Sequence, residues 1–172
     1  GDLLKLKPQE QLLKLEEIES VIRAALVLDF DAFRFTGGEP LVRDGFLDLA
    51  LRVSRLDGVR KLSLSTNGSL LERSLDSLAA ARVMSLNVSL DSLRPARYSQ
   101  VTRGGELGPV LAGIDAAAND GRFKVKLNAV LMRGFNDDEL VELAALTISR
   151  PVNLRFIEYM PFGNWQRVAG TG

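Results

Sequence analysis

The chain has 172 residues, 46% of them hydrophobic, and its 22 basic and 22 acidic side chains cancel in net charge. This length and apolar content predict a single domain over residues 1–172, with loosely ordered ends at 1–11 and 163–172. The balanced charge excludes a global field that would attract nucleic acid or a membrane surface. No apolar run approaches the roughly 18 residues of a membrane span and no secretory signal is visible, so we expect a cytoplasmic protein.

Two residue types are absent from the composition, cysteine and histidine. Without cysteine, the chain can hold neither a disulfide nor an iron–sulfur cluster. Without histidine, it lacks the commonest acid–base group and metal ligand at neutral pH. Any chemistry must therefore come from Lys, Arg, Glu, Asp, Ser and Asn, or from a bound cofactor.

The hydrophobic pattern predicts helices and strands that alternate along the chain. Five strands interleaved with helices indicate a parallel sheet with right-handed crossovers. The last predicted helix has an acidic first turn, as the helix dipole favours. In chain order the elements are helix Leu15–Leu28, strand Phe33–Phe35, helix Phe46–Leu56, strand Lys61–Ser65, helix Ser69–Ala81, strand Met84–Leu90, helices Arg94–Gln100 and Leu107–Asn119, strand Phe123–Met132, helix Asp137–Leu146 and strand Asn153–Tyr159.

The first strand runs into a turn with paired glycines, Thr36-Gly37-Gly38-Glu39-Pro40. Adjacent glycines allow positive φ angles and bring bare backbone amides close to a ligand. Glu39 can accept hydrogen bonds from an ammonium or hydroxyl group. A lone Gly-Gly pair is more often an ordinary strand-to-helix turn, so its neighbours must decide its meaning.

Polar and apolar residues alternate in every predicted strand. Strands covered by helices on both faces are nearly all apolar, which argues against an open doubly wound sheet, although the order of elements fits one. An antiparallel sheet with one wet face would also alternate, but the interleaved helices argue against it. We therefore expect a partial barrel with a polar, ligand-filled lumen. The residues on the hydrophilic faces are Arg34, Ser63, Ser65, Asn67, Ser85, Asn87, Ser89, Asp91, Lys124, Lys126, Asn128 and Arg155.

Three cations, Arg34, Lys126 and Arg155, would share this lumen with Ser65, Asn67, Ser89, Asp91 and Asn128. Unpaired cations are costly to bury, and phosphate oxygens suit both guanidinium and ammonium groups. Alternatively, one or more of the three points outward or pairs with Glu39, Asp91 or Glu158. Barrel active sites lie at the carboxyl ends of the strands, so the residues predict a polyanionic, nucleotide-like ligand there, without naming a reaction.

Seven motifs occur in order and resemble the MoaA family of GTP 3′,8-cyclases, radical S-adenosylmethionine (SAM) enzymes of molybdenum cofactor biosynthesis. The resemblance covers roughly residues 12–163. The glycine turn alone indicates only the radical SAM superfamily, whereas the third, sixth and seventh motifs are more specific. The motifs are Thr36-Gly37-Gly38-Glu39-Pro40-Leu41, Ser65-Thr66-Asn67-Gly68, Asn87-Val88-Ser89-Leu90-Asp91-Ser92, Thr102-Arg103-Gly104-Gly105, Lys126-Leu127-Asn128-Ala129-Val130, Gly134-Phe135-Asn136-Asp137-Asp138-Glu139 and Arg155-Phe156-Ile157-Glu158-Tyr159-Met160-Pro161.

The resemblance implies an α/β fold: a partial (β/α)6 TIM-like barrel of the radical SAM type, here lacking its first strand and cysteine loop. In that family an electron from a [4Fe–4S] cluster cleaves SAM, and the resulting radical abstracts hydrogen from C3′ of GTP. The ribose carbon then closes onto C8 of guanine, a lyase-type conversion to (8S)-3′,8-cyclo-7,8-dihydroguanosine 5′-triphosphate. The product passes to the synthase that makes cyclic pyranopterin monophosphate, and members are usually homodimers.

The resemblance also implies positions for the ligands. Gly37, Gly38, Glu39, Ser89 and Met160 would bind SAM. Arg34, Ser65 and Lys126 would bind GTP, with Arg155 as a further candidate. Ser65 stands where most members have threonine, which keeps the hydroxyl group.

The family uses two [4Fe–4S] clusters, and this chain has the cysteines of neither. We therefore expect a core fragment that is inactive by itself, with no catalytic or metal-binding residue of its own. Two alternatives stay open: a radical SAM enzyme acting on a peptide, and a cluster-free domain that binds a nucleotide or phosphate.

Overall fold

The computed structural model describes residues 12–160. The predicted loose order at 1–11 and 163–172 concerns residues outside this range. The helices of the described part are α1 (Leu15–Val27), α2 (Phe46–Ser54), α3 (Leu71–Ala80), α4 (Pro95–Thr102), α5 (Leu107–Asn119) and α6 (Leu140–Ser149), with short 3-10 turns η2 (Pro40–Val42) and η3 (Asp137–Glu139). The strands are β1 (Ala32–Phe35), β2 (Lys61–Thr66), β3 (Ser85–Ser89), β4 (Lys124–Leu131) and β5 (Val152–Glu158).

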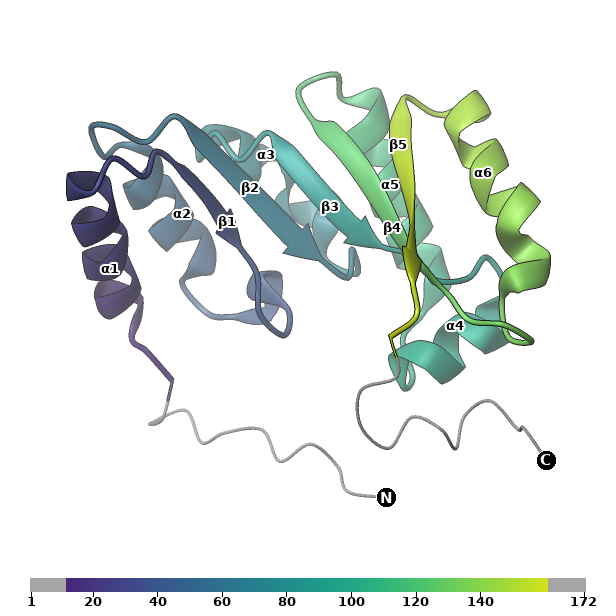
Figure 1. The fold of residues 1–172 in the computed structure, drawn as a ribbon. Coiled ribbons are helices and arrows are strands. Elements are labelled where there is room, and N and C mark those ends of the chain that lie inside the picture. Colours follow the sequence, from purple (N-terminus) through teal and green to yellow (C-terminus); the bar gives the residue numbers. More distant parts are fainter. Residues whose placement is uncertain (1–11, 161–172) are drawn as a thin grey trace.

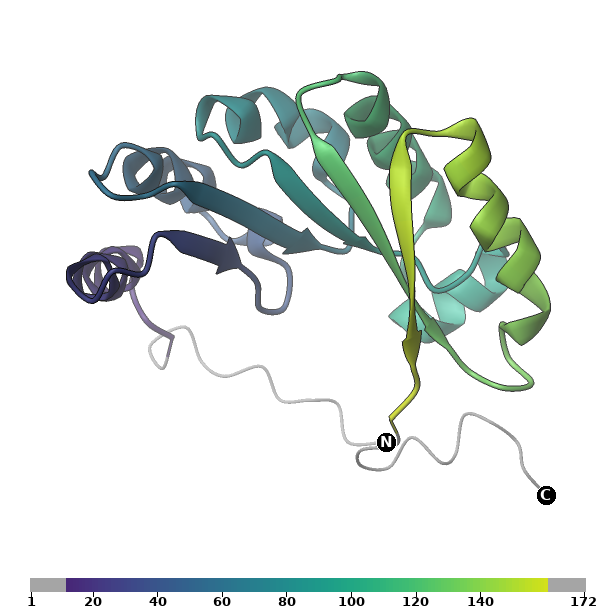
Figure 2. The same ribbon diagram turned by 45° about the horizontal axis from the view of Figure 1, so that its top comes forward.

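The five strands form one parallel sheet in the order β1-β2-β3-β4-β5. Each crossover therefore leads to the next strand in the same direction, whereas a doubly wound sheet reverses its strand order at a switch point. With every crossover of one hand, the connecting helices gather on one side of the sheet. Figures 1 and 2 show this arrangement: a curved sheet with helices on its convex side and an open concave side. The predicted partial barrel is confirmed.

The hydrophobic core lies between the convex face of the sheet and the helices. Leu64, Leu86 and Leu127 lie on adjacent strands and are 0% exposed. Gly113 of α5 allows close packing against the start of α3, because a Cβ there would lie 3.0 Å from Leu71 Cβ and 3.1 Å from the Gly68 carbonyl oxygen. Within the described residues, none of the helices is long and apolar enough to cross a membrane.

The segment before α6 differs from the prediction. An α-helix over Asp137–Leu146 was expected, but Asp137–Glu139 forms a 3-10 turn and the α-helix spans Leu140–Ser149. We attribute this difference to the carboxylate of Glu139. It is 0% exposed and bonds to the segment that follows β3, so the acidic turn packs inward rather than opening a solvated helix.

Candidate functional site: the cationic concave face

The strand register brings the predicted polar residues onto one face of the sheet. Arg34 lies beside Ser63, Ser63 beside Ser85, and Ser85 beside Lys124. Side chains at every second residue of a strand share a face, and the apolar residues between these belong to the core or pack against it. The polar rows therefore occupy the concave face. The next two rows are Ser65–Asn87–Lys126–Asn153 and Ser89–Asn128–Arg155. Two members of the polar rows, Ser63 and Asn87, are also buried, at 5% and 3% exposed.

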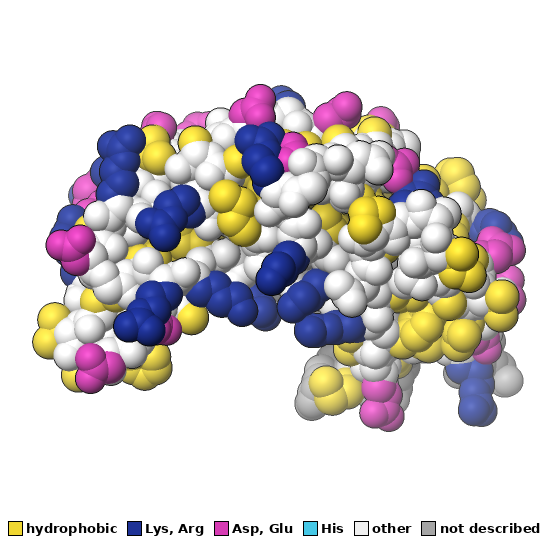
Figure 3. Space-filling model, turned by 90° about the horizontal axis from the view of Figure 1, so that it is seen from above, with side chains coloured by type: hydrophobic (Ala, Val, Ile, Leu, Met, Phe, Trp, Pro, Cys, Tyr) yellow, Lys and Arg dark blue, Asp and Glu magenta, His cyan; other side chains and the backbone are white. Residues whose placement is uncertain are grey.

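Basic residues flank a floor of small polar side chains on this face. Arg34 and Lys61 belong to β1 and β2, while Lys124 and Lys126 belong to β4 and Arg155 to β5. Figure 3 shows basic side chains gathered along the hollowed side of the molecule. The floor between them consists of Ser63, Ser65, Ser85, Asn87 and Ser89.

These five cations, the concave-face cations, have no acidic partner within residues 12–160. The ion pairs of that range involve other basic residues. Nearby Arg155, followed by burial and then Lys61, Arg34 and Lys124, lowers the pKa of Lys126 below its ordinary value. The alternative in which the cations pair with Glu39, Asp91 or Glu158 is therefore wrong for the described part. An anion bound here would relieve their mutual repulsion.

The glycine turn lies at the carboxyl end of β1, on the rim of the arch. Gly37 has φ of +148°, and a Cβ at Gly37 or Gly38 would meet nothing within 4 Å. Both glycines are exposed. The backbone amides of the turn are thus open to close approach by a ligand.

Glu39 connects the glycine turn to the loop that follows β2. Its Oε1 accepts hydrogen bonds from Thr66 Oγ1 at 2.8 Å and from Leu41 N at 3.1 Å, while its Oε2 accepts one from Asn67 N at 2.6 Å. The carboxylate therefore holds the loops after β1 and β2 together. Any bond from Glu39 to SAM would have to share these oxygens, and that role stays a prediction.

The other predicted site residues lie along the same end of the sheet. Ser65 is half-buried near the end of β2, Ser89 is exposed at the end of β3, and Met160 is 62% exposed after β5. Two further side chains expected in the lumen form hydrogen bonds at this end of the sheet, one within the loop after β2 and one to β4. Asn67 Oδ1 accepts a hydrogen bond from Ser69 N at 2.9 Å, and Asp91 Oδ1 accepts one from Val130 N at 2.8 Å.

A buried polar cluster beside this rim was missed by the sequence reasoning. Glu139 accepts hydrogen bonds from Ser92 Oγ at 2.8 Å, from Leu93 N at 2.7 Å and from Arg97 Nη1 at 2.9 Å. Burial raises the pKa of Glu139, but Arg97, the Leu93 amide and the Ser92 hydroxyl together hold that pKa below its ordinary value. The only sequence signal for this cluster was that Ser92 and Glu139 each belong to one of the family motifs.

Asn136 completes this cluster and is 0% exposed. Its amide nitrogen donates to the carbonyl oxygens of Asp91 at 2.6 Å and Val130 at 2.8 Å, and its oxygen accepts from Met132 N at 2.7 Å. The loop after β4 is thereby fixed to the loop after β3. Burial also raises the pKa of Asp91, although the Val130 amide opposes the shift.

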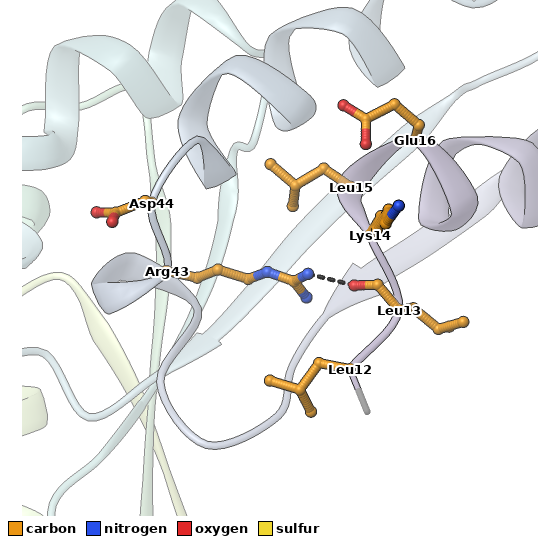
Figure 4. A pocket seen from close by; sticks show the side chains of 7 residues that line it. All are labelled: Leu12, Leu13, Lys14, Leu15, Glu16, Arg43 and Asp44. Atoms are coloured by element: carbon orange, nitrogen blue, oxygen red, sulfur yellow. Dashed lines mark hydrogen bonds between the residues drawn. The ribbon is translucent and has the colours of Figure 1, made fainter. Parts of the chain in front are cut away.

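A separate cavity of about 260 Å³ lies at the start of α1, lined by residues 12–16, Arg43 and Asp44. In Figure 4 the guanidinium of Arg43 donates a hydrogen bond to the carbonyl oxygen of Leu13. None of the predicted site residues lines this cavity, so we do not assign a ligand to it.

The residues present do not fit an iron–sulfur cluster. The chain has no cysteine, and residues 12–160 contain no group of three His, Cys, Asp or Glu residues that could hold a metal ion.

The family model described as "Radical SAM superfamily" matches residues 5–147. The chain belongs to the radical SAM superfamily.

Curated relatives within this superfamily are similar over most of the chain. A GTP 3′,8-cyclase of Pelotomaculum thermopropionicum is 50% identical over 157 residues, which cover 91% of this chain and 48% of the relative. A GTP 3′,8-cyclase of Pseudomonas putida is 47% identical, covering 91% of this chain and 47% of the relative. The chain thus spans about half the length of the curated relatives it matches.

Solved structures of other proteins support the fold. Streptococcus suis SuiB bound to S-adenosylmethionine matches with a TM-score of 0.73 at 18% identity, over 94% of this chain and 38% of that one. A radical SAM methyltransferase from Sphaerobacter thermophilus matches with a TM-score of 0.62 at 22% identity, over 83% and 45%.

Proposed function

We propose that this chain forms the barrel core of a GTP 3′,8-cyclase, the radical SAM enzyme that converts GTP to (8S)-3′,8-cyclo-7,8-dihydroguanosine 5′-triphosphate in molybdenum cofactor biosynthesis. Curated relatives that are 41–50% identical and carry this name support the proposal. The observation that carries it is the position of Lys126 among four other cations on an open face, with no carboxylate partner in the described part of the chain. A triphosphate has the charge that this face lacks.

In this proposal the concave face binds GTP through Arg34, Ser65, Lys126 and Arg155. Arg34 and Arg155 lie on opposite edge strands, but both are close enough to Lys126 to lower its pKa, which supports a polyphosphate that contacts all three. Ser65 contributes a hydroxyl group from the floor. The guanidinium groups supply paired donors and the ammonium a point charge.

SAM binds at the rim in the same proposal. The open glycine turn at Gly37 and Gly38 fits the close approach of its amino-acid end, with Glu39 beside it, and Ser89 and Met160 lie further along the strand ends. When bound, SAM supplies the group that removes a hydrogen atom from the substrate. The residues of this chain bind and orient the two ligands, one on the rim and one on the floor.

The cluster ligands must come from residues outside this sequence, and we derive no step through a cluster. The use of two clusters, the lyase class, a homodimer, a cytoplasmic location and transfer of product to the cyclic pyranopterin monophosphate synthase are proposals carried by the family resemblance alone.

Calorimetric titration of the complete protein with GTP and with GDP tests the proposal. We expect both to bind, and Arg34→Gln to weaken GTP binding about tenfold because one charge-assisted contact is lost. Arg55→Gln, which removes a cation from the end of α2 on the helix side, is the matched control and should leave the affinity unchanged. A complete protein that ignores both nucleotides would overturn the proposal in favour of another substrate, such as a peptide.

A further inference from the structure

Lys61 and Lys124 belong to the concave-face cations but have no assigned role. Each is the first residue of its strand, β2 and β4 respectively. Because the strands are parallel, both lysines lie at the amino-terminal end of the sheet, opposite the rim that carries Gly37 and Gly38. They therefore extend the cationic surface away from the proposed SAM site.

The register settles which way these side chains point. The neighbours that follow them, Leu62 and Val125, are 3% and 1% exposed and pack on the helices. Alternation then directs Lys61 and Lys124 to the concave face. Both are exposed, and neither forms an ion pair with a described carboxylate.

The two lysines straddle β3 and can reach one common group. β2 and β4 are each neighbours of β3, and Lys124 lies level with Ser63, two residues beyond Lys61. Strand spacing and rise place their backbones about 10 Å apart across the sheet and about 7 Å apart along it. Lysine has a flexible four-carbon stem, so two ammonium groups at this separation can converge on one anion. The small side chains of Ser63 and Ser85 occupy the same row of the floor as Lys124.

We propose that Lys61 and Lys124 bind the terminal phosphate of the nucleoside triphosphate. The inference rests on the proposed function and adds an orientation to it. Lys126 and Arg155, which lie nearer the carboxyl ends of the strands, contact the inner phosphates, and the polyphosphate tail points toward the amino-terminal end of the sheet, where Arg34 lies level with Lys124. The ribose and base then lie toward the rim, on the side of Ser89 and the glycine turn. Lys61 and Lys124 thereby make the site select a triphosphate over a diphosphate.

The test compares GTP, GDP and GMP as calorimetric titrants of the complete protein. The double variant Lys61→Gln/Lys124→Gln should lose at least about tenfold in GTP affinity, by loss of charge-assisted phosphate contacts. Its affinities for GDP and GMP should stay close to those of the unmodified protein, so the preference for GTP over GDP disappears. Lys61→Arg/Lys124→Arg keeps both charges and should retain the preference, and Arg55→Gln should change nothing.

The outcomes separate this inference from the proposed function. If the Gln variant weakens GTP and GDP equally, or weakens neither, the assignment to the terminal phosphate is wrong while the proposed function stands. If the unmodified protein binds neither nucleotide, both fail. Thermal melting verifies folding, and the two single variants replace the double one if it does not fold; each should then lose part of the GTP preference.

Discussion

At the scale of single residues, Lys126 shows that the proposed binding face lowers the stability of the ligand-free protein. Arg155, burial, Lys61, Arg34 and Lys124 all lower the pKa of Lys126, so its charged form is less favourable in the folded protein than in the unfolded chain. Without an anion, this face is a concentration of like charge on the surface of a chain whose net charge is zero. A bound polyanion would turn the same charges into favourable contacts.

Lys126→Gln is expected to raise the melting temperature of the ligand-free protein and to weaken GTP binding about tenfold, since it removes both the repulsion and one phosphate contact.

The lowered pKa of Lys126 also predicts how the stability of the unmodified protein depends on pH. Between that pKa and the higher one of the unfolded chain, the unfolded chain binds more protons, so the stability of the unmodified protein rises with pH. The variant's higher melting temperature relative to the unmodified protein, largest near pH 7, should therefore diminish in calorimetric scans at increasing pH. A variant that melts lower at pH 7 would contradict the repulsion.

Single residues also show what the sequence could and could not predict about the site. Alternation along β4 was enough to place Lys126 on the concave face, because the strand is long and its apolar residues are unambiguous. Lys61 has the same alternation and begins its predicted strand, but the prediction for the hydrophilic face did not include it. Glu139 was missed because an acidic run before a helix resembles an exposed first turn, and only the fold brings Ser92 and Arg97 to it.

At the scale of elements, two family motifs that are far apart in the sequence, Asn87–Ser92 and Gly134–Glu139, meet in one buried cluster. The loop after β3 and the loop after β4 are joined through Asn136 and Glu139, which satisfy backbone groups of both. Loops joined by buried hydrogen bonds hold the strand ends in a fixed arrangement, and Ser89 lies directly before one of them. We infer that these motifs keep the rim in shape.

Asn136→Ala should lower the free energy of unfolding by about 2–4 kcal/mol, because it leaves several buried backbone groups without partners. Asp138→Asn is the matched control: Asp138 is in the same turn and pairs with Arg97, but its side chain is 58% exposed. That change should cost less than about 1 kcal/mol. Chemical denaturation measures both, and equal small losses would show that other contacts hold the two loops together.

Most helices and strands were predictable because each has a clear apolar period. The predicted bounds of α5, Leu107–Asn119, agree with the structure, and its buried Val110, Ile114 and Ala117 recur at helical spacing. The predicted start of α6 was wrong. Hydrogen bonds between Glu139 and the segment after β3 determine the backbone there, and no hydrophobic period encodes them.

At the scale of the whole molecule, the arch has two free edges within residues 12–160. β1 is 4 residues long and β5 is 7. The longer edge also carries Phe156 and Ile157, which are 38% and 40% exposed. A long apolar edge strand is a template for pairing with another chain.

The isolated 172-residue chain should therefore self-associate in a concentration-dependent way, and Phe156→Lys should reduce this, since an edge lysine opposes strand pairing. Ile148→Lys is the matched control, because Ile148 is 88% exposed but lies on α6 rather than on the edge. Size-exclusion chromatography with light scattering measures the association. A chain that stays monomeric at every concentration, or one that Ile148→Lys disperses equally, would show that β5 is not the contact.

The carboxylate of Glu39 links the proposed binding sites of SAM and GTP. It bonds at once to the turn beside the glycines and to the amide of Asn67, two residues beyond Ser65. In the proposed arrangement, a SAM molecule that attracts this carboxylate also pulls on the loop that follows β2, the strand of Ser65. Such a shared support gives the two binding events an interaction free energy, and thermodynamics makes that interaction reciprocal: whatever factor SAM applies to the affinity for GTP, GTP must apply to the affinity for SAM.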